Sequence, residues 1–205
     1  MEKSGMKLMR IMLVVVLLVV GFSSAYSYVE KKVTRIELPK GNLKWTNVRP
    51  ENARICIPAA FTDTGGNVSG AYRYDSKTYQ NGKAMKMRVS MKGESFYISR
   101  NWLSDNGFQQ LTLVCDSKAM KFVDSRRSFR RALCKDGKST FILQSNYPMT
   151  LNEFAVECRR CSTNATYLDM GEYGYGYVKT NNIVRPLFVW GIFTKGKQTN
   201  WIYIE

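Results

Sequence analysis

An aspartate ends a short apolar run near the C-terminal end of the sequence, and a loop of glycines and tyrosines follows it. The segment reads ATYLDMGEYGYGYVK, and the acid is Asp169. The chain contains no histidine, so it can form neither a Ser–His–Asp triad nor a Cys–His pair. Carboxylates, with arginine as their electrostatic partner, are therefore the groups that remain for acid, base or nucleophile chemistry.

Two adjacent arginines, Arg130 and Arg131, lead toward the glycine-containing turn KDGK. The guanidinium group presents a fork of N–H donors that suits phosphate and carboxylate oxygens. Neighbouring side chains of an extended segment point to opposite faces, so we expect one of this pair to be exposed. We expect Arg126 and Arg127 to be surface charge. Arginine near a carboxylate suits glycosyl transfer, in which two carboxylates commonly flank the scissile bond.

The clearest helix signal is the segment MTLNEFAVECRRC, which predicts a helix over about residues 150–161. Thr150 and Glu153 form a capping box, in which each side chain satisfies a free backbone N–H at the helix start. Apolar residues then recur at helical spacing, and Cys158 belongs to their stripe, so it is expected to point inward. A weaker helix is expected near Arg100–Asp105.

The rest of the chain is rich in strand patterns. In AMKMRVSMKG apolar and polar residues alternate, and this period of two predicts a half-buried strand. Further short strands are expected at Ala53–Phe61, Ala71–Tyr79, Phe108–Cys115, Phe141–Leu143, Leu187–Phe193 and Trp201–Ile204. No internal repeat or linker interrupts them. We therefore expect a single strand-rich α+β domain with a mixed β-sheet and few helices.

Residues 1–25 have the layout of a secretory signal peptide, with basic residues, an apolar core and then the small residues SSA. The apolar core is shorter than the roughly 20 residues that span a bilayer. An uncleaved N-terminal anchor is the alternative, and membrane contact would then involve this segment alone. We expect a signal peptide over 1–25, a lead-in strand region over 26–52 and a domain over 53–205, in a secreted, periplasmic or cell-envelope protein.

The formal charge of the chain is +15, and it falls to +13 without residues 1–25, which carry three basic residues and one acidic residue. Such a positive field attracts anions, among them phosphorylated glycans, envelope polymers, lipid head groups and nucleic acid. An exported protein that is basic without such a partner is the alternative. The basic residues are scattered and no nucleic-acid-binding motif frames them, so nucleic acid is disfavoured. An anionic glycan or sugar-phosphate substrate is the expected partner.

The sequence contains five cysteines, and an odd count leaves at least one thiol unpaired or paired between molecules. Cys158 and Cys161 form a CxxC motif at the end of the predicted helix, whereas a thiolate is stabilised at a helix start. Zinc would need a second ligand pair, which a chain with no histidine can draw only from widely separated cysteines. We therefore expect the cysteines to pack in the core, and we expect no metal site and no cofactor.

The order of motifs in the second half resembles the phosphodiester glycosidase domain family, which includes the "uncovering enzyme", N-acetylglucosamine-1-phosphodiester alpha-N-acetylglucosaminidase. The segments RAL, KDGK, MTLNEFA and NATYLDMG resemble the family's arginine, "dG" turn, "mTL.EfA" and "LDGGGSS". Upstream, ICIPAAFTDTGGNVSGAYRYDSKTY resembles the family's first motif, an apolar run that enters Asn-Gly-Gly-Phe-Phe and a hairpin. The resemblance covers residues 53–205 and identifies a divergent, exported, bacterial-type member.

This resemblance implies an exported hydrolase of the bond between the anomeric carbon of a sugar and a phosphate oxygen. Asp169 matches the family's aspartate and would be the base or electrostatic stabiliser, and Arg131 matches its arginine and would bind the phosphate. Glu172 is a candidate second carboxylate. The candidate substrate-binding residues are Arg130, Asp63, Asn146, Gly171, Tyr173 and Tyr175. Each has a simpler alternative, such as turn capping for the aspartates or an ordinary strand edge for the tyrosines.

The sequence departs from the family pattern at two places. Pro58-Ala59-Ala60 replaces Asn-Gly-Gly, and Met170-Gly171-Glu172 replaces the triple glycine that follows the acid. Glycine lets a phosphate approach backbone N–H groups closely, and larger residues partly fill that space. These changes motivate a different hypothesis, a non-catalytic envelope protein that keeps the fold and binds a glycan or another partner.

Overall fold

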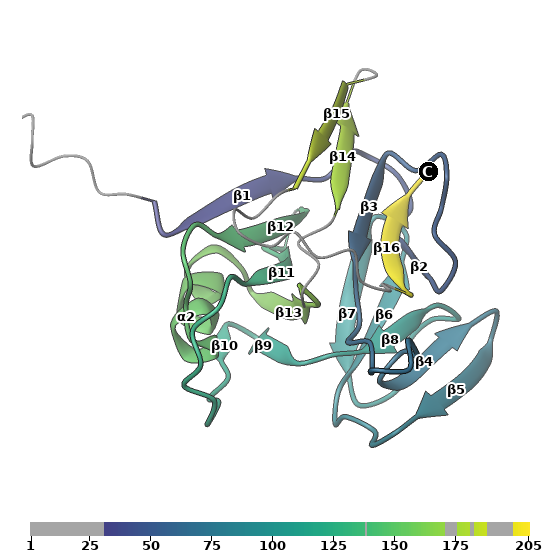
Figure 1. Ribbon diagram of the computed structural model, residues 1–205, viewed down its shortest axis with the longest axis horizontal. Helices are drawn as coiled ribbons and strands as arrows, with labels where there is room; N and C mark the ends of the chain where they lie inside the picture. Colours follow the sequence, from purple (N-terminus) through teal and green to yellow (C-terminus); the bar gives the residue numbers. More distant parts are fainter. Residues whose placement is uncertain (1–30, 138, 171–175, 181–182, 188–198) are drawn as a thin grey trace, which may run out of the picture. The chain divides into compact units, whose positions relative to one another are not determined.

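The structure, a computed structural model, describes residues 31–137, 139–170, 176–180, 183–187 and 199–205. Contacts divide the chain into two units, Met1–Lys31 and Lys32–Glu205, and every element named below lies in the second. Within the described part of that unit, strands greatly outnumber helices (Figure 1). No helix among the described residues has the length and apolarity needed to cross a membrane.

The strands form three sheets. The first sheet contains, in spatial order, β1 (Val33–Glu37), β12 (Thr140–Ser145), β11 (Arg131–Lys135), β13 (Asn164–Leu168), β9 (Thr112–Cys115) and β10 (Lys118–Ala119). The second contains β15 (Ile183–Pro186), β14 (Tyr177–Thr180), β3 (Ile55–Pro58), β16 (Trp201–Ile204) and β2 (Lys44–Thr46). The third contains β5 (Lys77–Asn81), β4 (Gly70–Tyr74), β8 (Gly107–Gln109), β6 (Arg88–Lys92) and β7 (Ser95–Ser99).

Every pairing between these strands is antiparallel. The expected mixed sheet is therefore wrong, and the described fold is mainly β rather than clearly α+β. Short turns account for the antiparallel pairs that are neighbours in sequence, such as β4 with β5, and the direction of the other pairs is set by non-local pairing, as of β1 with β12. The turn between β4 and β5 is an example, because Asp75 and Ser76 have φ of 47° and 64°, as a two-residue hairpin turn requires.

The predicted helix is confirmed as α2 (Leu151–Cys161). The Thr150 hydroxyl accepts a hydrogen bond from the N–H of Glu153 at 3.1 Å, and the Glu153 carboxylate accepts one from the N–H of Thr150 at 2.8 Å. The capping box therefore fixes where the helix starts. The expected weaker helix is wrong, because Arg100–Asp105 form only bends and irregular backbone.

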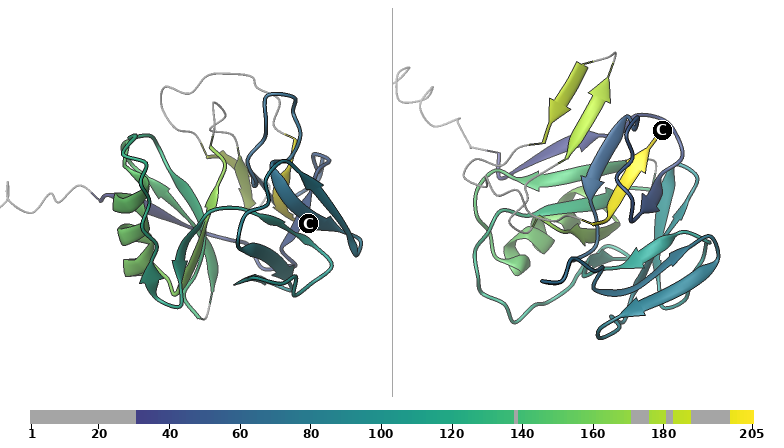
Figure 2. Two further views of the ribbon diagram at one scale, coloured as in Figure 1. Left: turned by 90° about the horizontal axis from the view of Figure 1, so that it is seen from below. Right: turned by 45° about the vertical axis from the view of Figure 1, so that its right-hand side comes forward.

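The central strands of the first sheet are buried on both faces, with α2 on one side and the other two sheets on the other (Figure 2). On the helix side, Ala132 and Cys134 of β11 pack with Phe154 of α2. On the opposite side, Leu133 of the same strand joins the core of the second and third sheets. Successive residues of β11 thus enter two different cores, as the alternation of side chains along a strand requires.

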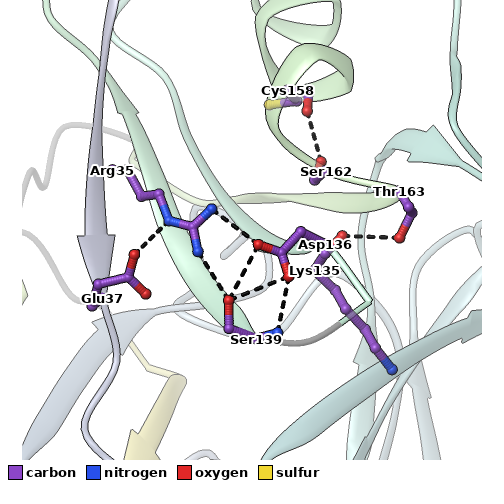
Figure 3. Close-up of polar contacts among 8 residues, drawn as sticks. All are labelled: Arg35, Glu37, Lys135, Asp136, Ser139, Cys158, Ser162 and Thr163. Atoms are coloured by element: carbon purple, nitrogen blue, oxygen red, sulfur yellow. Dashed lines mark hydrogen bonds and ion pairs between the residues drawn. The ribbon is translucent and has the colours of Figure 1, made fainter.

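Residues 26–52, expected to lead into the domain, supply β1 and β2, which pair with β12 and β16. Arg35 of β1 also reaches the turn between β11 and β12 (Figure 3). Its guanidinium forms an ion pair with Asp136 at 3.1 Å and donates to the Ser139 hydroxyl at 2.9 Å. It further pairs with Glu37. The edge of the first sheet is therefore tied to the turn that resembles the family's "dG" motif.

The cysteines are free thiols in this structure, and burial separates them into two groups. Cys56, Cys134 and Cys158 are buried, which confirms the inward orientation predicted for Cys158. Burial raises the pKa of the Cys56 thiol to about 11 and raises that of Cys158 well above its usual value. Cys115 and Cys161 are partly exposed. Among the described residues, no group of three or more Asp, Glu, Cys or His side chains is placed to hold a metal ion.

We predict that a thiol reagent at pH 8 modifies Cys115 and Cys161 of the folded protein well before Cys158. A raised pKa means that less of the reactive thiolate is present below that pKa, and burial also blocks the reagent. Peptide mass spectrometry after timed alkylation measures the order. Unfolding in urea should remove the difference. Rapid modification of Cys158 in the folded protein would contradict the packing described above.

Candidate active site

The two adjacent arginines lie on opposite faces of the first sheet. Arg131 shares the face of Leu133, toward the second and third sheets, whereas Arg130 shares the face of Ala132, toward α2. Both are buried, with relative exposures of 0% and 3%. The expectation that one of the pair is exposed is therefore wrong. Both arginines are buried because the first sheet lies between two layers, and no local pattern in RRAL reveals this.

Arg131 is held by polar groups from two other parts of the fold. Its Nε and Nη2 donate to the side-chain oxygen of Gln144 on β12 at 3.1 and 2.8 Å. Nη2 also donates to the backbone carbonyl of Leu187 at 2.9 Å. A side chain at Gly176 would bring its Cβ within 3.3 Å of Nη1 of the same guanidinium. Burial lowers the pKa of Arg131 to about 10.

Asp169 follows the last residue of β13 and is almost fully buried. In the pairing of β13 with β11, Leu168 lies opposite Arg131, so the next position, Asp169, lies at the level of Arg130. The backbone N–H of Asp169 donates to the carbonyl of Ala59 at 2.9 Å, which fixes the end of the strand. A carboxylate is thus brought to the edge of the first sheet on the side of Arg130.

Asp169 and Arg130 line one pocket of about 530 Å³, which we call the Asp169 pocket. Its lining includes Phe61, Asp124, Arg126, Arg130, Tyr167, Asp169 and Met170. Two cationic and two carboxylate side chains therefore face a cavity large enough for a small ligand.

Within the Asp169 pocket, Arg130 is held in place by backbone carbonyls. Its Nε donates to the carbonyl of Met149 at 3.1 Å, and its Nη2 donates to that of Arg126 at 2.7 Å. Its guanidinium carbon lies 5.8 Å from the centre of the Tyr167 ring. Burial raises the pKa of Tyr167, and Asp169 raises it further, whereas Arg130 lowers it. Both charged groups therefore affect the pKa of Tyr167.

Two predicted substrate-binding residues lie away from the Asp169 pocket. Asp63 stands in a turn, where its carboxylate accepts from the backbone N–H of Asn67 at 2.8 Å and from the Asn81 side chain at 2.9 Å. These hydrogen bonds, the one from Asn67 first, lower its pKa. Asn146 is exposed and accepts from the Thr34 hydroxyl at 2.7 Å. Neither residue is among those that line the pocket.

Four further candidates, Gly171, Glu172, Tyr173 and Tyr175, lie outside the described residues. The structure also adds residues that sequence reasoning missed, namely Asp124, Arg126 and Tyr167. The position of Tyr167 could have been predicted from the sequence. It stands two positions before Asp169, and residues two apart in an extended strand share one face. Asp124 and Arg126 stand in irregular backbone, where no period predicts orientation.

The residues that depart from the family's first motif are part of the core. Ala59 and Ala60 are fully buried, and both main-chain polar groups of Ala60 are satisfied by Asn200. The N–H of Ala60 donates to the Asn200 side chain at 2.6 Å, and that side chain donates back to its carbonyl at 3.0 Å. Met170 is likewise buried and lines the Asp169 pocket. The methyl and thioether groups thus occupy space that glycines would leave open.

The fold is similar to that of a known catalytic domain, that of zebrafish N-acetylglucosamine-1-phosphodiester alpha-N-acetylglucosaminidase, auto-inhibited by its pro-peptide. The two structures superpose with a TM-score of 0.56, and their sequences are 14% identical. The match covers 84% of this chain and 75% of that chain. The resemblance seen in the motifs is therefore confirmed for the fold. No protein-family model and no curated protein sequence matches this chain.

We predict that Arg131→Leu lowers the free energy of unfolding by about 1–3 kcal/mol, because the buried oxygens of Gln144 and Leu187 lose a donor. Arg127→Leu is the matched control, since the Arg127 side chain is 52% exposed and should contribute little. Urea unfolding of the three proteins measures the difference. Equal stability of Arg131→Leu and the parent protein would show that Arg131 is not needed to hold the sheets together.

Proposed function

We propose that this protein is a hydrolase of glycosyl phosphodiesters, or of a closely related anionic glycan. The proposal is supported by the similarity of the fold to a glycosyl-phosphodiester hydrolase domain. The single observation that carries it to this chain is the Asp169 pocket, in which a buried carboxylate and a buried guanidinium share one cavity. Such a cavity suits a ligand that is anionic at one end and becomes cationic at the other during reaction.

In the proposed reaction, Arg130 and Arg126 hold the phosphate oxygens through charge-assisted hydrogen bonds. The bond between the anomeric carbon and the bridging oxygen breaks, and its electron pair leaves with the phosphate monoester. That group departs readily, because its second pKa is about 6 and it needs little protonation. The residual positive charge spreads over the anomeric carbon and ring oxygen of the sugar.

Asp169 has two roles open to it in this scheme, which differ in what it contacts. As an electrostatic stabiliser it faces the cationic sugar, and its burial strengthens that attraction because little water screens it. As a general base it takes a proton from a water molecule, whose hydroxyl oxygen then bonds to the anomeric carbon. Asp124, or Glu172, which lies outside the described residues, would be the second carboxylate of the pair that such reactions commonly use.

Arg131 remains a proposed phosphate ligand on the strength of the sequence resemblance alone. Its guanidinium lies on the face of β11 opposite to Arg130, bound to Gln144 and Leu187. Gly171, Tyr173 and Tyr175 are proposed as substrate contacts on the same basis. Arg130, by contrast, is supported by its place in the Asp169 pocket.

The alternative function, glycan binding without turnover, is favoured by one specific observation. Ala59, Ala60 and Met170 are all buried where the family pattern has glycines. Side chains at these positions restrict how closely a phosphate can approach the backbone N–H groups. A protein of this kind would keep the pocket and bind the glycan, and the carboxylate would then contribute only to affinity.

We predict that Asp169→Asn lowers kcat for hydrolysis of a hexose-1-phosphate methyl ester or its N-acetylhexosamine counterpart by at least about 100-fold, since amides neither accept a proton nor carry charge. NMR detection of the free sugar measures turnover. Asp116→Asn is the control, because it removes one negative charge in the turn between β9 and β10, where asparagine accepts the same positive φ.

The outcomes of this experiment separate the two functions. Turnover by the parent protein that survives in Asp169→Asn would remove the proposed mechanism. Binding of these esters by the parent protein, with no free sugar released, would establish the non-catalytic alternative instead. Loss of turnover in both Asp169→Asn and Asp116→Asn would indicate an effect of charge rather than of the pocket.

We also propose that the protein is exported after removal of residues 1–25, on the basis of its N-terminal charge and hydropathy pattern. Expression in a bacterial host should yield a secreted or periplasmic product whose N-terminal sequence begins at Tyr26. Retention of residues 1–25 in a membrane fraction would favour the anchor instead. Replacing Ala25 with a bulky residue should block the cleavage.

A further inference from the structure

A second pocket of about 530 Å³ lies at the hairpin formed by β4 and β5, which stands away from α2 (Figures 1 and 2). We call it the amide pocket, because its lining includes Asn47, Asn67, Gln80, Asn81, Tyr79 and Thr199. These residues come from the segment after β2, the turn before β4, the β5 strand and the segment before β16. None of the described residues that line it also lines the Asp169 pocket.

The amide pocket is uncharged in a strongly basic chain. No described residue of its lining is Lys, Arg, Asp or Glu, although the whole chain carries a formal charge of +15. A phosphate or carboxylate ligand would be expected to meet cationic side chains. Four carboxamides stand there instead, and each presents both N–H donors and a carbonyl acceptor. The chemistry of the lining therefore matches a neutral ligand with many hydroxyl or amide groups.

Two of the carboxamides are held in place by a residue behind the pocket. Asp63 accepts a hydrogen bond from the Asn81 side chain at 2.9 Å and weaker ones from the Asn67 side chain at 3.4 Å. Both amide nitrogens are thus directed toward Asp63, which leaves the Oδ1 atoms of Asn67 and Asn81 as acceptors. Asp63, expected from sequence to touch the substrate, is a positioning residue here. Preorganised polar groups reduce the entropy lost on binding.

An aromatic stack forms one side of the same pocket. The rings of Tyr72 and Tyr79 are 5.0 Å apart with an interplanar angle of 14°, and Trp45 packs behind Tyr72 at 5.0 Å. Tyr79 is 44% exposed. The stack fixes the ring of Tyr79 and leaves part of it open to a ligand. Such a platform suits the C–H face of a pyranose ring, while the phenol hydroxyl remains available for hydrogen bonding.

The hydroxyl of Thr199 supplies a third observation. It is buried and has no hydrogen-bond partner among the described residues. Buried polar atoms in folded proteins are nearly always paired, so an unpaired one beside a cavity indicates a missing water or ligand group. Thr199 lines the amide pocket, so this unpaired hydroxyl lies next to the cavity.

We propose that the amide pocket binds an uncharged saccharide, with a pyranose ring against Tyr79 and its hydroxyls bonded to the surrounding carboxamides. A vicinal pair of sugar hydroxyls both donates and accepts, as each carboxamide does, which is why a saccharide fits this lining better than an anion or an apolar ligand. The site is independent of the proposed hydrolase reaction, since it uses none of the groups of the Asp169 pocket. It would recruit neutral glycans to the protein.

The test begins with a panel of immobilised uncharged oligosaccharides, namely cello-, malto-, xylo- and manno-oligosaccharides and N-acetylglucosamine oligomers. The tightest binder is then measured by calorimetry. We expect Tyr79→Ala to weaken binding by at least about tenfold, because the stacking surface is lost, and Tyr79→Phe to stay close to the parent protein. Tyr74→Ala is the matched control, since Tyr74 lies in the same hairpin with 38% exposure but does not line the pocket.

Two further variants separate an effect on the amide pocket from effects on folding and on the Asp169 pocket. Gln80→Ala changes an exposed amide of the pocket with little risk to folding and should weaken binding without lowering thermal stability. Asp169→Asn should bind as the parent protein does, which separates this proposal from the hydrolase. No binding to any member of the panel would overturn the proposal. So would equal losses in Tyr79→Ala and Tyr74→Ala, or a loss of saccharide binding in Asp169→Asn.

Discussion

Burial of both faces of the central strands β12, β11, β13 and β9 in the first sheet governs the rest of this structure. The residues Arg131–Cys134 of β11 are all buried, and so is Arg130 just before the strand, although both arginines are charged. A buried guanidinium must be hydrogen-bonded, and the fold supplies carbonyl and carboxamide oxygens from segments far apart in the chain. Asp169 stands just past the end of β13, and there its carboxylate lines the Asp169 pocket.

Local patterns predicted the parts of the fold that local forces determine. The capping box of Thr150 and Glu153 located the start of α2 because its hydrogen bonds span only three residues. The alternation around Val89 marked the position of β6, although Ser90, on its polar face, is fully buried rather than open to solvent. The motif order that ends at Asp169 led to the correct fold because spacing between motifs reflects the order of strands and helix. These features required no knowledge of which strands pair.

The errors concern non-local properties. Whether a sheet is mixed depends on strands that lie more than a hundred residues apart, as β1 and β12 do, and no short segment encodes that pairing. The burial of both arginines follows from layers above and below β11. For Asp63 the sequence offered both a turn role and a substrate contact, and its carboxylate bonds Asn67 and Asn81 within and beside the turn. The exposure predicted for Arg126 is confirmed, but its place in the lining of the Asp169 pocket was not foreseen, because it stands in irregular backbone.

The position of β16 has a consequence for how the chain acquires its structure. This strand lies between β3 and β2 in the second sheet. Both neighbours come from the first sixty residues, and they become part of one sheet only when residues 201–204 pair with them. Closing the long loop between β3 and β16 costs conformational entropy before the native contacts form and offset that cost. Topologies of this kind fold slowly. A chain that crosses a membrane from its N-terminus would keep this sheet incomplete throughout transit. Completion of the second sheet therefore waits for residues 201–204, whatever the order in which the other strands form.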